Sequence, residues 1–400
     1  MDADLDTGLI DDFIALCGAR LWRKRLAELR ARASQTTRIG RQSNQIHSVE
    51  LMIDRLRGNR VDRPVTAAEN LILGYVAEAV MLTGQLPQAG RDRLQAALCD
   101  ALADTNSLIP LMHLIRTAML QRSRGFEVSF AGLEEAAPFD LMIRRDGAEA
   151  EIACDVMSAE DGHGVHRGAW FQLVDRIDPE LQTWLRAHPG RYLLKLTFPL
   201  GLRLPDTKGD TALPALHARI SHLLADQKRT DSDAAAVLRL DPLMLAAAQA
   251  DELGLMPRLR QEFGPEAHLA VTAAGGGVFV MAARAGQQNE VAAAIRRRMA
   301  AITPARLTGT RPGILAMFVE DTDRLEWRLM RERLELEGEA RQFLTYPDAR
   351  PVVAVTCSSR LELFGIGEPD GAAGGELRFR NPAHPAAKRP ELAPAVLSSI

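Results

Sequence analysis

The sequence predicts an α/β protein of more than one domain. Apolar residues recur at helical spacing over about the first hundred positions, whereas short strand-like segments begin near Phe126. Helical and strand-like segments then alternate up to about residue 364. The 400 residues correspond to two or three domains of ordinary size, and the 46% of hydrophobic residues suffices for globular cores.

Changes of pattern along the chain predict four regions. They are a helical N-terminal region (1–104), a core of helices and strands (105–204), a second α/β region (205–364) and a Gly/Pro-rich tail (365–400). In the first region the apolar spacing predicts helices over 9–17, 20–41, 67–83 and 91–102. Because Gly, Pro and Ala dominate the tail, we expect it to be extended and loosely ordered.

The core region carries the most specific pattern. A helix with one apolar face is predicted over 106–121, and Gly125 ends it. Three strands follow, and Arg145-Asp146-Gly147 forms a hairpin turn between the second and the third. A second helix and a fourth strand complete the order α-β-β-β-α-β. These elements are expected over 126–130, 139–144, 148–157, 167–187 and 192–198.

The second α/β region has no phosphate-binding loop, since its Gly275-Gly276-Gly277 lies between two strands and not between a strand and a helix. Its expected helices and strands follow in chain order: helix 215–225, strands 235–240, 268–272 and 278–282, helix 289–301, strand 314–319, helix 325–343 and strand 352–357.

Composition and charge indicate a cytoplasmic protein without a membrane partner. The start is acidic and lacks the basic and apolar regions of a signal peptide, and no apolar run is long enough to span a bilayer. The four cysteines form no CxxC pair, which predicts reduced thiols and no zinc site. The net charge, 49 − 52 = −3, gives the whole chain no basic excess for nucleic acid.

The core resembles the PD-(D/E)xK nuclease superfamily, which has the restriction-endonuclease-like fold. The resemblance covers about 106–200 and rests on the α-β-β-β-α-β order, on Asp140 at the start of the second strand and on Glu149-Ala-Glu151-Ile-Ala-Cys-Asp155 in the third. The run from Cys154 to Arg167 is similar to one in uncharacterised bacterial members. The resemblance implies Mg²⁺ held by carboxylates, with a lysine two residues after an acid.

The third strand departs from the pattern of an active nuclease. The acid-x-lysine pair is represented by Glu151-x-Ala153 or by Ala153-x-Asp155, and neither contains lysine. In the register that the residues after Asp155 favour, the acid has become Ala153 and the lysine has become Asp155. An aspartate there would repel phosphate. We therefore expect a catalytically degenerate nuclease-like protein, a pseudoenzyme without a cofactor, that binds nucleic acid or a protein partner.

Two alternatives stay open. The first is an active Mg²⁺-dependent nuclease in which Asp140, Glu151 and Asp155 hold the metal. Its basic group would then come from elsewhere in the sequence, with Lys195 in the expected fourth strand and His166 as the candidates. The second alternative is an interaction scaffold that never meets nucleic acid.

A basic run near the N-terminus supplies candidate phosphate contacts. Between residues 20 and 60 there are 11 Lys or Arg and 3 acids, a local charge of 11 − 3 = +8. Arg23, Arg25 and Arg30 in this run, together with Arg167, are the candidate nucleic-acid-binding residues. The alternative is a solvated helix face that is paired with nearby acids. The chain holds only five lysines, but this bias toward arginine does not explain an acid at position 155.

Overall fold

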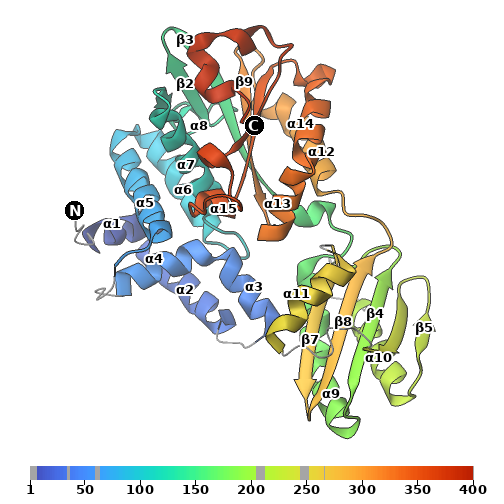
Figure 1. Ribbon diagram of the computed structural model, residues 1–400. Coiled ribbons are helices and arrows are strands. Elements are labelled where there is room, and N and C mark those ends of the chain that lie inside the picture. The colour runs from blue at the N-terminus through green and yellow to red at the C-terminus, as the bar shows by residue number, and fades with distance from the viewer. Residues whose placement is uncertain are drawn as a thin grey trace. The chain divides into compact units, whose positions relative to one another are not determined.

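The computed structural model describes residues 7–33, 37–58, 64–203, 212–243, 252–264 and 266–399. The chain divides into two compact units. The first unit comprises 1–34, 43–159 and 292–400, and the second comprises 35–42 and 160–291. Each unit combines helices with a mixed sheet, which confirms the predicted α/β class (Figure 1). Within the described ranges, no helix is both long and apolar enough to cross a bilayer.

In the described residues of the first unit, six strands form a mixed sheet with the order β1-β2-β3-β9-β10-β11. β1, β2 and β3 form an antiparallel meander, β3, β9 and β10 run parallel, and β11 is antiparallel to β10. The strands are β1 (Glu127–Ser129), β2 (Leu141–Arg145), β3 (Ala148–Ser158), β9 (Gly313–Glu320), β10 (Val352–Ser359) and β11 (Leu377–Arg380).

Helices cover both faces of this sheet. Figure 1 shows α5, α6 and α7 on one side of it and α12, α13 and α14 on the other. Successive strand residues point to opposite faces, and the even-numbered residues Ala150 and Ile152 of β3 pack into the same core as Ile115 of α7. The bounds of the covering helices are α5 (Ala67–Gln85), α6 (Gln88–Ala101), α7 (Ile109–Ser123), α12 (Val291–Arg306), α13 (Arg324–Glu332) and α14 (Glu335–Leu344).

The N-terminal helices share this core. Phe13 and Trp22 are fully buried in it, and Thr66 begins α5 with a capping box in which it exchanges hydrogen bonds with Glu69. The predicted helix over 20–41 is two helices, α2 and α3. The helices that precede α5 are α1 (Thr7–Cys17), α2 (Ala19–Ala33), α3 (Arg38–Ile46) and α4 (Ser48–Gly58).

In the second unit, the described residues form a five-stranded sheet with the order β5-β6-β4-β8-β7. β4 runs parallel to β8 and antiparallel to β6, and α9 buries Trp170, Leu173 and Ile177 in the core of this unit. Its elements are α9 (Arg167–Ala187), β4 (Arg191–Phe198), α10 (Ala212–Ala225), β5 (Thr230–Ser232), β6 (Val237–Pro242), α11 (Glu252–Phe263), β7 (His268–Ala274) and β8 (Gly277–Ala285).

The strand order corrects the expected domain boundaries. The strand expected to complete the core is β4, and it pairs with β6 and β8 in the second unit. The strand that pairs in parallel with β3 is β9, which we expected in the second region. With 160–291 set aside as an insertion, the first unit has the order α7-β1-α8-β2-β3-α12-β9. Apart from the four-residue helix α8 (Ala131–Glu134), this is the order α-β-β-β-α-β.

The C-terminal tail is also not loosely ordered as we expected. β11 pairs with β10, and Leu392, Ala395 and Val396 are fully buried in the main core of the first unit. The expectation failed because the high content of Gly, Pro and Ala hides these few apolar residues, which lie in η6 (Pro390–Leu392) and α16 (Ala393–Val396).

The packing of the tail predicts a position-specific loss of stability. We expect Leu392→Ala to lower the free energy of unfolding by about 2–5 kcal/mol, because it leaves a cavity in the core. Leu397, which is 46% exposed, is the matched control, and Leu397→Ala should change stability by less than about 0.5 kcal/mol. Urea unfolding followed by circular dichroism measures both, and equal effects would contradict this packing.

Candidate functional site

A cavity of about 810 Å³ opens in the first unit beside the carboxyl ends of β3 and β9. β2 begins at Leu141, opposite Ile152, so β3 continues beyond its antiparallel neighbour and lines the cavity from Cys154 to Ser158. The carboxyl ends of parallel strands are where ligand sites of α/β sheets form. The acidic residues that line the cavity are Asp100, Asp140, Asp155, Glu320 and Asp321.

Asp140 directly precedes β2, and its side chain binds the backbone of the neighbouring strand β3. Its carboxylate accepts a hydrogen bond from the backbone N–H of Cys154 at 2.7 Å and from the Arg306 guanidinium at 2.6 Å. Burial raises the pKa of Asp140, while Arg306 and the Cys154 N–H act in the opposite direction. Asp140 therefore ties the two strands together and is already paired with a cation.

Asp155 is held by a two-pronged arginine contact. Arg298 of α12 donates to both of its carboxylate oxygens, at 2.6 and 2.8 Å. Such bidentate pairs are among the stronger hydrogen-bonded contacts in proteins. Only 8% of Asp155 is exposed, whereas 47% of the Arg298 side chain is exposed, so the carboxylate is the buried partner of this contact.

Glu151 points to the same face of β3 as Asp155 but does not line the cavity. It is fully buried, and its carboxylate accepts hydrogen bonds from the backbone N–H and the hydroxyl of Thr308. Asp155 is four positions after Glu151 along the strand, which places their Cα atoms about 13 Å apart. The predicted acidic trio of Asp140, Glu151 and Asp155 is therefore not brought together.

These residues do not fit a bound Mg²⁺ ion. Among the residues that the structure describes, no group of three or more His, Cys, Asp or Glu side chains is arranged to hold a metal. Asp140 and Asp155 both line the cavity, but each is paired with its own arginine, and Glu151 is bound to Thr308. No step through a metal ion follows from this arrangement.

Three residues that the sequence reasoning missed also line the cavity. Glu320, at the end of β9, accepts a hydrogen bond from Arg360 at 2.6 Å, and its other oxygen, Oε1, is buried with no hydrogen-bond partner in the described ranges. Asp321 accepts one from Ser158 at 2.5 Å. Burial raises the pKa of Glu320. The signal available in the sequence is the Glu-Asp pair that directly follows the apolar strand 314–319.

The third missed residue is His113 of α7, and only 2% of it is exposed. Its Nε2 lies 2.9 Å from the carbonyl oxygen of Ala316, so this nitrogen carries the proton of the neutral ring. Burial lowers the pKa of His113 to about 4. Nδ1 is then a buried acceptor, and it has no hydrogen-bond partner among the described residues.

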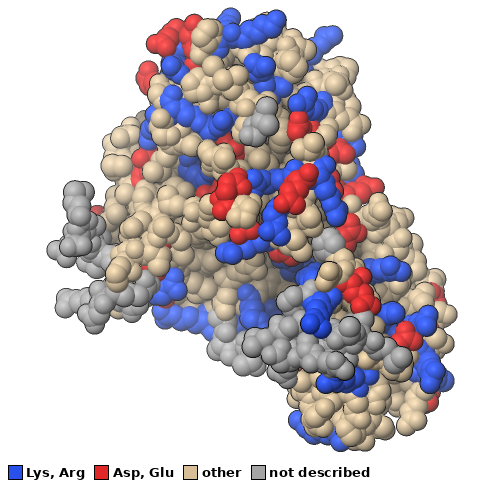
Figure 2. All heavy atoms as spheres, viewed as in Figure 1, with Lys and Arg blue, Asp and Glu red and all other residues tan. Residues whose placement is uncertain are grey.

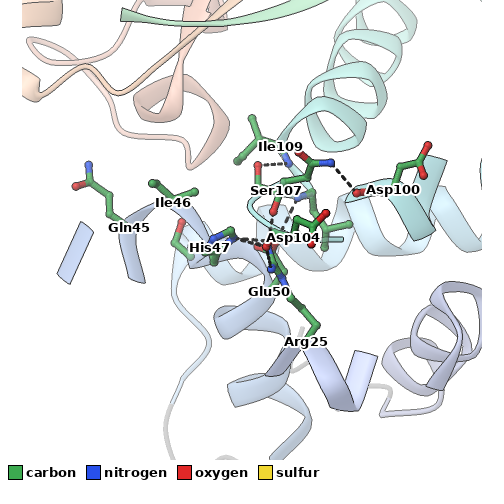
Figure 3. Close-up of polar contacts among 12 residues, drawn as sticks. Arg25, Gln45, Ile46, His47, Glu50, Asp100, Asp104, Ser107 and Ile109 are labelled. Atoms are coloured by element: carbon green, nitrogen blue, oxygen red, sulfur yellow. Dashed lines mark hydrogen bonds and ion pairs between the residues drawn. The ribbon is translucent and has the colours of Figure 1, made fainter. Parts of the chain in front are cut away.

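Arg25 supports the wall of the cavity and does not face solvent. It donates hydrogen bonds to the backbone carbonyls of Asp104 and Asn106 in the loop between α6 and α7, and contacts His47 Nδ1 at 3.1 Å (Figure 3). Only 1% of Arg25 is exposed. The prediction that Arg25 binds nucleic acid is therefore wrong, because a charge count along the sequence does not detect burial.

The rest of the basic run is largely paired with acids. Arg30 forms an ion pair with Asp54, and Arg57 pairs with Asp11 at 2.8 Å, whereas Arg23 is exposed and contacts the Ala19 carbonyl at 3.2 Å. Basic and acidic side chains are interspersed over much of the face shown in Figure 2. The structure thus agrees with the alternative of a solvated, paired helix face.

Lys195, His166 and Arg167 belong to the second unit. Lys195 lies on β4, the expected fourth strand, and pairs with Asp241 at 3.5 Å; β4 pairs with β6 and β8 and not with β3. His166 precedes α9, and burial lowers its pKa. The backbone N–H of Arg167 donates to Glu160 at 2.6 Å. None of the three lines the cavity of the first unit.

Comparison of the chain with models of known protein families, with curated proteins and with solved structures gave no match. The geometry of the cavity therefore carries the functional argument.

The role of Arg25 in the cavity wall predicts a stability effect. We expect Arg25→Ala to lower the free energy of unfolding by about 3 kcal/mol, since it removes a buried side chain together with its two hydrogen bonds to backbone carbonyls and its contact with His47. Arg23→Ala, on the exposed side of the same helix, should change it by less than about 0.5 kcal/mol. Urea unfolding of the two variants tests this, and equal stabilities would overturn the structural role of Arg25.

Proposed function

We propose that this chain is a catalytically degenerate protein of the PD-(D/E)xK nuclease type that acts by binding a partner. The observation that carries the proposal is the pairing of Asp140 with Arg306 and of Asp155 with Arg298. A metal-dependent phosphodiesterase needs carboxylates that are free to hold the metal. Here Asp140 and Asp155 are both engaged by guanidinium groups, which remain charged at any physiological pH.

The arrangement of the first unit supports the nuclease-type core. Its helices and strands follow the order α7-β1-β2-β3-α12-β9 once the inserted segment and the four-residue helix α8 are set aside. Asp140 lies at the start of the second strand, and Ala153 and Asp155 occupy the third. These are the places that the resemblance implies for the acids and the lysine, and the lysine is absent.

The chemistry of the cavity favours a partner with a positively charged group. Glu320 Oε1 and His113 Nδ1 are buried acceptors without partners in the described chain, and Asp321 is a further carboxylate at the wall. A phosphate backbone would be repelled by such a surface, whereas a lysine or arginine side chain would be attracted. Together with the burial of Arg25, this favours a protein partner over nucleic acid.

A cleavage assay tests the loss of catalysis. We expect the purified chain with Mg²⁺ or Mn²⁺ to cleave plasmid DNA and single-stranded RNA no faster than its Asp140→Asn variant, because Asp140 is occupied by Arg306. Asparagine keeps the acceptor for the Cys154 N–H, so the variant should remain folded. Metal-dependent cleavage that Asp140→Asn abolishes would contradict the proposal and establish the active alternative.

A binding assay tests the kind of partner. We expect a tetralysine peptide to bind at low salt, and Asp321→Asn to weaken it about tenfold, because the variant removes one charge and keeps the hydrogen bond from Ser158. Asp12→Asn, at an exposed acid of α1, is the matched control and should have no effect. Calorimetric titration measures all three proteins, and equal affinity in the two variants would exclude this cavity as the site.

A further inference from the structure

A second cavity of the first unit, about 850 Å³ in volume, lies at the opposite end of the sheet. Its walls come from the end of α14, from η3 (Pro347–Ala349) and from the turn after β11. Arg350 precedes β10 by two residues, and Asn381 directly follows the antiparallel strand β11. This cavity is thus at the amino end of β10, while the acidic cavity is at the carboxyl ends of β3 and β9.

The charge of the second cavity is opposite to that of the first. Arg341, Arg350 and Arg380 line it, and no Asp or Glu is among its lining residues. The guanidinium groups of Arg350 and Arg380 have no hydrogen bond or ion pair within the part of the chain that the structure describes. Arg341 pairs with Glu337 at 2.6 Å, and 70% of its side chain is exposed. The cavity therefore presents uncompensated positive charge.

The turn after β11 is held in place by its own hydrogen bonds. The Asn381 side chain donates to the Val352 carbonyl at 2.9 Å and accepts from the Ala383 N–H at 3.1 Å. His384 Nδ1 accepts from the Ala386 N–H at 3.1 Å, so the proton of the neutral ring is on Nε2, which can donate. A site that is fixed before binding loses little conformational entropy when a ligand arrives.

The remaining wall is apolar. It is formed by Leu344, Tyr346, Pro347, Pro382, Ala383 and Pro385. Tyr346 is itself fixed, since its hydroxyl accepts a hydrogen bond from Arg296, whose guanidinium carbon lies 5.9 Å from the ring centroid. Small-molecule sites combine such apolar walls with a few placed polar groups, in volumes of about 300–1,000 Å³.

We propose that this cavity binds an organic phosphate of the mononucleotide class. Arg350 and Arg380 would contact the phosphate, because guanidinium groups match phosphate oxygens in two-pronged hydrogen bonds. The apolar wall around Leu344 and Pro382 would contact the body of the ligand. This site is separate from the acidic cavity, so it does not depend on the proposed nuclease-type origin.

Calorimetric titration of the full chain with AMP tests the site. We expect Arg350→Gln and Arg380→Gln each to weaken AMP binding about tenfold, the usual loss for one charged hydrogen bond. Arg328→Gln is the control, because it makes the same substitution and removes the same charge at an arginine that lies outside the cavity. This control should leave the affinity unchanged.

Three further ligands test separately what the phosphate and the apolar body contribute to binding, and whether the phosphate belongs to a nucleic acid. Adenosine should bind at least about tenfold more weakly than AMP because it lacks the phosphate, and inorganic phosphate should bind more weakly because it lacks the apolar body. A 5′-phosphorylated oligonucleotide that binds more tightly than AMP, and still depends on Arg350, would identify a nucleic-acid end as the source of the phosphate. No AMP binding, or equal AMP binding by Arg350→Gln, Arg380→Gln and Arg328→Gln, would overturn the proposal.

Discussion

The parallel pairing of β3 with β9 is the contact on which the first unit depends. It runs in unbroken register from Glu151 beside Gly313 to Ser158 beside Glu320. Parallel strands need a crossover connection, and here that connection contains the whole segment 160–291 together with α12. The pairing brings the carboxyl ends of the two strands together and so creates the acidic cavity. The entropy cost of closing a loop grows only slowly with its length, which is why such an insertion is tolerated.

The parts of the fold that could be predicted are those set by local sequence. The hairpin of β2 and β3 follows from the Asp146-Gly147 turn, and the strands themselves lie close to the predicted positions. The partner of β3 could not be read from chain order, because the next strand along the chain, β4, enters another sheet. A usable signal was the apolar run 314–319, which is typical of a central strand buried on both faces, whereas β4 carries Lys195.

Part of the candidate site could also be predicted, because local sequence sets the strands that carry it. Asp140 and Asp155 are on adjacent strands of the meander, and the cavity contains both. Their arginine partners come from α12, on the far side of the insertion, so no local pattern pairs Arg298 with Asp155. Burial could not be predicted either. The count of charged residues that made Arg25 a candidate cannot distinguish it from the exposed Arg23. Both depend on contacts between distant segments.

The aspartate at position 155 is matched by an arginine of a neighbouring helix. Where the resemblance implies a lysine, the strand carries an aspartate, and Arg298 supplies a positive charge from the facing helix. A lysine on the strand would leave its ammonium available to a phosphate, but a guanidinium bound by both prongs to a largely buried carboxylate does not. Separating that pair would leave Asp155 uncompensated in a site with 8% exposure, which is costly. The positive charge near the third strand is thus engaged by the Asp155 carboxylate, and this pairing is the basis of the proposed binding role.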